Sequence, residues 1–183
     1  MKPDVKSVLT SEEFRSATWL CISIAVYNMM SGVNIINGYS TQIFDHIGDE
    51  GTFTTAQKNY FVGCSGFFGA CLSKYTVLHL NRRTILIGGH FLMGIFLFLI
   101  AIFIVTKHPN LTIFSMSAFI ITFQASNGAL FWVYVSDIGT EATFGLCLFT
   151  LMVMLLLQSL TALPLMNSSW CGVDGMFFGL AAF

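Results

Sequence analysis

The sequence predicts an all-α protein: a polytopic transmembrane helix bundle with five full spans and a truncated sixth. The 183 residues are 55% hydrophobic and only 9% charged, whereas a soluble domain usually carries about 25% charged residues. The mean hydropathy of +0.77 agrees with this composition. So few charges cannot cover a surface that faces water, but a surface that faces lipid needs no such cover.

The apolar residues gather into stretches long enough to cross a bilayer. A membrane helix needs about 20 mostly apolar residues, because each residue rises about 1.5 Å and the hydrocarbon layer is about 30 Å thick. Five stretches meet this requirement, and a sixth, at residues 175–183, is too short to cross as a helix. The five full spans are predicted at residues 17–44, 60–80, 85–105, 111–135 and 144–165.

The spans differ in the polar residues that interrupt them. The first is rich in glycine and asparagine, and the fourth carries Gln124 and Asn127. We expect Asn37 and Asn127 to serve in helix packing. The third is the most uniform, and we expect its one ionisable residue, His90, to be satisfied within the membrane. The fifth contains a single amide, Gln158, which we expect to bond to a neighbouring helix. The connections are short, so successive helices are predicted to be antiparallel neighbours.

The first 16 residues precede the first span and form a separate segment. They contain Asp4, Glu12 and Glu13 and have no apolar core, so they do not resemble a cleavable signal peptide. We expect residues 1–16 to include a short helix at the membrane interface. Residues 17–183 are then predicted to form the transmembrane bundle.

The placement of lysine and arginine predicts the orientation, because these residues are enriched in loops that face the cytoplasm. Six lie on the side of the N-terminus and two on the opposite side, so the N-terminus is predicted to face the cytoplasm or its topological equivalent. The sequence selects no organelle, and the plasma membrane and the mitochondrial inner membrane both stay open. The six are Lys2, Lys6, Arg15, Lys74, Arg82 and Arg83, and the two are Lys58 and Lys107.

Three stretches, in order, resemble signatures of the sugar porters of the major facilitator superfamily. Residues 31–44 (SGVNIINGYSTQIF) resemble the seventh helix of that family. Residues 79–89 (HLNRRTILIGG) resemble its D-R-x-G-R-R loop, and residues 128–137 (GALFWVYVSD) resemble its tenth-helix signature. The likeness implies that the chain corresponds to the C-terminal half of such a transporter, a six-helix unit that rocks against a second half around a midplane site.

The resemblance also implies which residues would contact a sugar. Asn34 falls on the family's sugar-contacting asparagine, Asn28 on the first residue of its glutamine pair, and Trp132 on its cavity tryptophan. Gln124 lies eight residues before Trp132, where sugar porters often place a polar contact. Sugars are bound by hydrogen bonds to their hydroxyls together with an apolar or aromatic face. For each residue helix packing remains the alternative, because amides in membrane helices often bond to neighbouring helices.

Other positions match or depart from the gating and substrate motifs. The resemblance assigns Arg82 and Arg83 to the loop motif, and Asp137 stands in place of the tenth-helix glutamate. Met29 replaces the second glutamine of the pair, and Gly66 stands where the family tends to hold a sugar-binding asparagine. The departures fall on substrate contacts and gating charges, while the apolar spans remain intact.

Two functions follow from this pattern. We expect an accessory or structural subunit of a larger membrane complex, derived from a sugar porter whose transport site has eroded. The alternative is a working hexose transporter in which this half pairs with a second six-helix half. The expected partners are the lipid bilayer, other membrane chains of a complex or the second half, and a sugar.

Several classes of function are not expected. The sequence holds no H-E-x-x-H motif, phosphate-binding glycine loop or nucleophile elbow, so it predicts no enzyme and no catalytic residue. The histidines and cysteines do not cluster, so it predicts no metal site and no cofactor. A formal net charge of -1 provides no basic field to attract nucleic acid.

Overall fold

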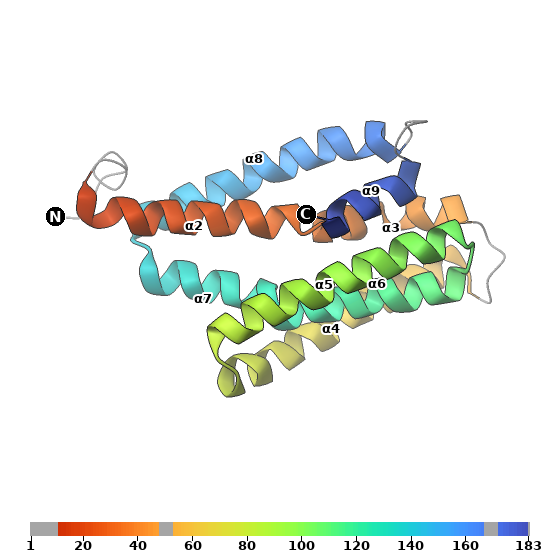
Figure 1. Ribbon diagram of the computed structural model, residues 1–183, viewed down its shortest axis with the longest axis horizontal. Helices are drawn as coiled ribbons and strands as arrows, with labels where there is room; N and C mark the ends of the chain where they lie inside the picture. The colour runs from red at the N-terminus through yellow and green to blue at the C-terminus, as the bar shows by residue number, and fades with distance from the viewer. Residues whose placement is uncertain (1–10, 48–52, 167–171, 183) are drawn as a thin grey trace.

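The computed structural model describes residues 11–47, 53–166 and 172–182, and these residues form a bundle of helices without a strand (Figure 1). The predicted all-α fold class is therefore confirmed. Along the chain the elements are α2 (Glu12–Met30), α3 (Val33–Ile47), α4 (Thr55–His79), α5 (Arg82–Val105), α6 (Pro109–Phe123), the wide turn η1 (Gln124–Gly128), α7 (Ala129–Ile138), α8 (Glu141–Met166) and α9 (Gly172–Ala182).

The five predicted spans are confirmed as helical stretches long and apolar enough to cross a membrane. The observed helices extend the predicted apolar stretches by a few residues, because polar residues at a helix end can continue the backbone ladder outside the hydrocarbon. The predicted short sixth segment is α9, which at about 1.5 Å per residue covers about half of a bilayer. The five stretches are Phe14–Asp45, Thr55–His79, Arg82–Val105, Pro109–Ile138 and Glu141–Met166.

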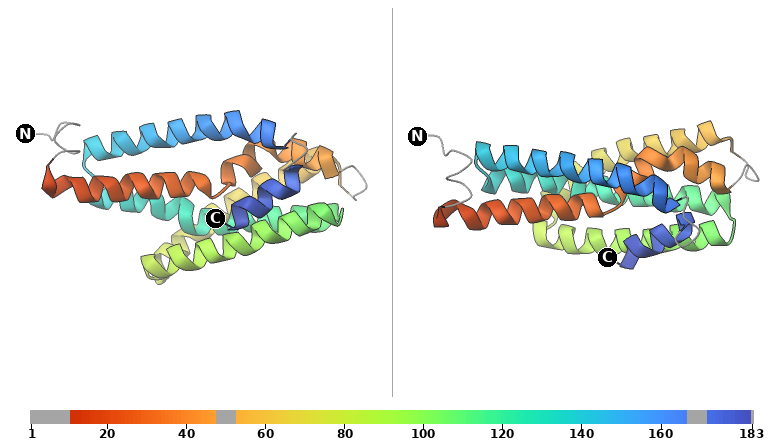
Figure 2. Two further views of the ribbon diagram at one scale, coloured as in Figure 1. Left: turned by 45° about the horizontal axis from the view of Figure 1, so that its top comes forward. Right: turned by 90° about the horizontal axis from the view of Figure 1, so that it is seen from above.

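The helices pack around two apolar clusters. α6 contacts both α4 and α5, α9 packs against α5 and α8, and α2 pairs with α8 (Figures 1 and 2). The larger cluster joins α3, α5, α6 and α9, and its fully buried centre includes Ile36, Ile100, Met116, Phe119 and Phe177. The smaller cluster joins α2, α7 and α8 and comprises Cys21, Ala25, Phe131, Val135, Cys147 and Leu151.

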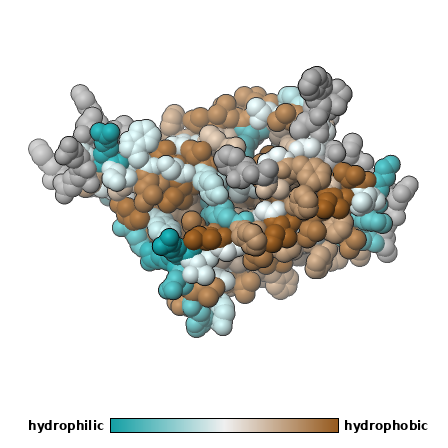
Figure 3. Space-filling model, viewed as in Figure 1, coloured by the Kyte–Doolittle hydropathy of each residue, from teal (hydrophilic) through white to brown (hydrophobic). Residues whose placement is uncertain are grey.

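The outward faces of the helices are apolar. Phe67 of α4, Phe91 of α5 and Phe149 of α8 each expose most of their surface, at 70%, 71% and 68%. Figure 3 shows hydrophobic side chains over the middle of the α5 face and hydrophilic side chains toward both ends. A soluble monomer rarely exposes so much contiguous apolar surface, so this surface fits a protein surrounded by lipid.

The first span is broken in its middle. α2 runs without interruption from Glu12 to Met30, and α3 begins at Val33. Between them Gly32 has a φ of 82°, which only glycine adopts without strain. The break changes the direction of the chain at the start of α3. As a result, residues of α2 and of α3 face the same cavity, which is described below. Residues 1–10 lie outside the described residues, as does most of the predicted interfacial segment.

The fourth span is interrupted by η1, one wide turn of π-helix between α6 and α7. A π-type turn replaces the i→i+4 bonds of the regular helix with i→i+5 bonds, and here neighbouring helices pack closely against it. Gly69 of α4 lets the α6–η1 segment approach, since a Cβ there would lie 2.8 Å from the Cβ of Gln124. Thr76 of α4 also donates its hydroxyl to the carbonyl oxygen of Ala125 at 2.6 Å.

Candidate functional site

A cavity of about 270 Å³ lies where α2, α3, η1, α7 and α8 meet. All four residues predicted to contact a sugar line it: Asn28, Asn34, Gln124 and Trp132. They come from two regions of the chain about 100 residues apart. The break in the first span and the wide turn in the fourth each face this cavity, so both departures from regular helix serve to form it.

The helix break is held by the amides of Asn34 and Gln158. Gln158 of α8 donates from Nε2 to the carbonyl oxygen of Met29 at 2.5 Å. Asn34 donates from Nδ2 to Oε1 of Gln158 at 3.3 Å and lies 3.0 Å from the sulfur of Met29. The prediction that Gln158 bonds to a neighbouring helix is therefore confirmed, and Asn34 is partly committed to the same network.

Gln124 and Trp132 form the opposite wall. Gln124 begins η1, and its Oε1 lies 2.8 Å from the position that a Cβ on Gly128 would take, so Gly128 leaves room for the end of this amide. Trp132 is 47% exposed, and its ring packs edge-on against Phe131 at 5.0 Å between centroids. The ring of Trp132 and the amide of Gln124 therefore line the same cavity.

Asn37 is a cavity residue that sequence reasoning assigned to helix packing. It is exposed on α3 and lines the same cavity. Its spacing contained the signal, because Asn34 and Asn37 are three residues apart and therefore share a helix face. Within the described part of the chain, the side-chain amides of Asn28, Asn37 and Gln124 form no hydrogen bond.

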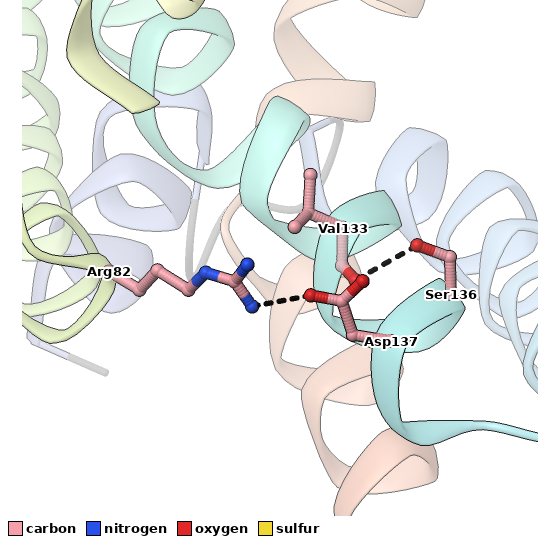
Figure 4. Close-up of polar contacts among 4 residues, drawn as sticks. All are labelled: Arg82, Val133, Ser136 and Asp137. Atoms are coloured by element: carbon pink, nitrogen blue, oxygen red, sulfur yellow. Dashed lines mark hydrogen bonds and ion pairs between the residues drawn. The ribbon is translucent and has the colours of Figure 1, made fainter. Parts of the chain in front are cut away.

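The predicted gating residues lie at the end of the bundle that holds the start of α5 and the end of α7. Arg82 donates from Nη1 to Oδ2 of Asp137 at 2.6 Å, although 55 residues separate them (Figure 4). Both side chains are about half exposed, so the pair adds about 1 kcal/mol or less to stability. Arg83 is exposed and pairs with no acid among the described residues.

A comparison with protein-family models identifies the family. The model described as Sugar (and other) transporter matches residues 2–183. The chain belongs to this sugar transporter family. No curated protein matches the chain. The family match agrees with the resemblance drawn from residues 31–44, 79–89 and 128–137.

A second cavity of this sugar transporter family member, about 850 Å³, is formed by α2, α5 and α9. Its lining is apolar except for Tyr27, Ser31 and His90, and none of the predicted sugar-contacting residues reaches it. Its greater size therefore does not make it the better candidate, because sugar hydroxyls need many polar partners. No group of three potential metal ligands occurs among the residues with described positions.

Proposed function

We propose that this bundle forms one wall of a hexose site and acts as one half of a sugar transporter. The observation that supports it is the set of amides on the 270 Å³ cavity. The side-chain amides of Asn28, Asn37 and Gln124 have no hydrogen-bond partner among the described residues. Asn37 is exposed and Gln124 is partly exposed, so these amides are open to a polar ligand that enters the cavity.

The chemistry of the wall suits a sugar ring. Each amide offers two donors and an acceptor oxygen, which matches hydroxyls that both donate and accept. Trp132 offers an apolar face against which the C–H face of a sugar ring can pack. None of the described residues that line the cavity is charged, which favours a neutral hexose over a sugar phosphate or an acid.

The cavity is small for a complete ligand site. Ligand sites usually enclose about 300–1,000 Å³, and this cavity measures about 270 Å³. A second six-helix half would supply the other wall. In this superfamily, transport proceeds by rocking one half against the other around a midplane site.

We also propose that the N-terminal end faces the cytoplasm or its equivalent. Arg15, Lys74 and the Arg82–Asp137 pair mark that end, while Lys58 and Lys107 mark the other. In a background with Cys64, Cys71 and Cys171 changed to alanine, a membrane-impermeant thiol reagent applied from outside to cells would then label a cysteine placed at Lys107 and not one placed at Lys74. Labelling of both or the reverse would contradict this orientation.

A sugar titration followed by the fluorescence of Trp132 tests the proposed site. In the Trp19→Phe, Trp170→Phe background Trp132 is the sole tryptophan. D-glucose is expected to quench its emission saturably, and L-glucose is not. Gln124→Ala is expected to weaken the apparent affinity about tenfold, the value of one hydrogen bond of about 1.4 kcal/mol.

The matched control is Gln42→Ala, an exposed amide on α3 that bonds to no described residue and does not line the cavity. This variant should titrate like the parent. Equal quenching by D- and L-glucose, or equal effects of the Gln42 and Gln124 changes, would show that the cavity does not bind hexose.

The accessory-subunit role is the second candidate. It is favoured by the Asn34 amide, which is partly committed to Gln158 rather than to the cavity. The sequence departures at Met29 and Gly66 favour it too. An accessory subunit would show no D-glucose quenching of Trp132, so the same titration separates the two candidates.

A further inference from the structure

His90 of α5 holds a defined tautomer. Its Nδ1 lies 2.7 Å from the carbonyl oxygen of Leu86. Because a carbonyl oxygen only accepts, Nδ1 must carry the hydrogen. The other ring nitrogen, Nε2, then has a free lone pair in the neutral ring. It faces Nδ2 of Asn127 at 3.3 Å, and the amide donates to it.

Asn127 is the link from this histidine to the wide turn. It lies inside η1 and is only 2% exposed. Three residues before it in the same turn is Gln124, which lines the cavity of 270 Å³. A shift of Asn127 therefore moves the turn that carries Gln124.

The turn is held from two sides. On the α4 side, Thr76 bonds to the carbonyl oxygen of Ala125, and Gly69 gives the close approach. On the α5 side, Gly89 lets Ser126 approach, and the next residue, His90, bonds to Asn127. η1 has i→i+5 backbone bonds in place of the regular i→i+4 bonds, and these contacts hold it against α4 and α5.

We propose that His90 is a positioning residue for the sugar site, acting through Asn127 to fix η1 and hence the amide of Gln124. The inference rests on the proposed function only in taking Gln124 as a sugar contact. The ring of His90 also contacts that of Tyr27 at 4.7 Å between centroids. A role in packing alone would use that contact and would not depend on Nε2 as an acceptor.

Two substitutions separate positioning from packing. In His90→Gln the side-chain oxygen can take the place of Nε2 and still accept from Asn127. In His90→Asn the shorter amide reaches only the Nδ1 position, so the bond to Asn127 is lost. The two variants thus differ chiefly in the contact at issue.

The reporter is the thiol introduced by Gln124→Cys, in the full chain reconstituted in lipid nanodiscs with Cys64, Cys71 and Cys171 changed to alanine. Its labelling rate by a small water-soluble methanethiosulfonate measures how the turn presents position 124. His90→Asn is expected to change this rate about fivefold or more, because the loss of one buried hydrogen bond, here from Asn127 to His90, is worth about that factor in an equilibrium. His90→Gln is expected to stay within about twofold of the parent.

His108→Asn, the same change at an exposed histidine before α6, is the control and should leave the rate unchanged. Equal rates in the parent and His90→Asn, or equal changes in both His90 variants, would overturn the inference. So would a ¹⁵N spectrum of the unaltered protein in which Nε2 of His90, rather than Nδ1, carries the hydrogen. This last measurement holds even if a variant fails to fold.

D-glucose quenching of Trp132 is measured in parallel on the chain that keeps Gln124. If the sugar gives no quenching while His90→Asn still changes the labelling rate at position 124, the positioning role stands and the proposed function fails. If the sugar quenches while His90→Asn has no effect, the proposed function stands and the positioning role fails.

Discussion

Leucine in place of Gly69 or Gly89 is expected to destabilise the bundle by about 3 kcal/mol or more, the upper range for overpacking. At Gly69 a Cβ would lie 2.9 Å from the backbone of Ile121, which cannot rotate away. At Gly89 it would lie 2.5 Å from the Cβ of Ser126. Either side chain would separate α6 and η1 from a neighbouring helix. Thermal unfolding in nanodiscs measures the effect.

The same two helices offer matched controls. Gly63 of α4 and Gly88 of α5 have nothing within 4 Å of a Cβ position. Leucine at Gly63 or Gly88 is expected to change the unfolding transition little, because the new side chain would face lipid or open space. Similar losses at Gly88 and Gly89 would show that α5 does not pack against η1 as described.

Gln158→Leu is expected to cost about 1–3 kcal/mol, because it leaves the Met29 carbonyl at the helix break without its donor. Asn34 loses its acceptor in the same step. The break between α2 and α3 should then open more often. Faster hydrogen exchange of the backbone amides of Ile35 and Ile36, which bond to the carbonyl of Gly32, is the local signature.

The exposed Gln42 supplies the control for this substitution. Gln42→Leu makes the same chemical change on α3 without touching the break. It should leave exchange at Ile35 and Ile36 as in the parent. Gln158→Leu would argue against the network if it left both exchange and stability unchanged. In an Asn34→Leu background its effect should shrink, since the two amides share one network.

The fold class and the five spans could be predicted from the sequence because they depend on one property. A stretch such as Arg82–Val105 must be helical and apolar to cross lipid, whatever its neighbours are. The family could be recognised because the motifs at residues 31–44 and 128–137 keep their order. Neither inference needed the three-dimensional arrangement.

The site could be predicted only in part. Asn28, Asn34, Gln124 and Trp132 were expected as sugar contacts, and the structure brings all four to one cavity. Whether they bind a sugar stays a prediction. The wide turn η1 could not be foreseen, because the segment Gln124–Gly128 has no pattern that distinguishes a π-type turn from an α-helix.

Contacts between distant residues were the least predictable part. Arg82 and Asp137 were each assigned to gating, but their pairing across 55 residues depends on how α5 and α7 are placed. The bond between His90 and Asn127 likewise spans 37 residues. Asn37 was assigned to packing, although its helical spacing from Asn34 indicated a shared face.

We propose that the described bundle binds hexose at one wall and does not carry it across a membrane alone. Radiolabelled D- and L-glucose uptake into proteoliposomes that contain this chain as the sole protein tests it directly. A preparation that shows D-glucose quenching of Trp132 is expected to admit both sugars equally slowly. Uptake of D-glucose that exceeds that of L-glucose and disappears in Gln124→Ala would contradict the account.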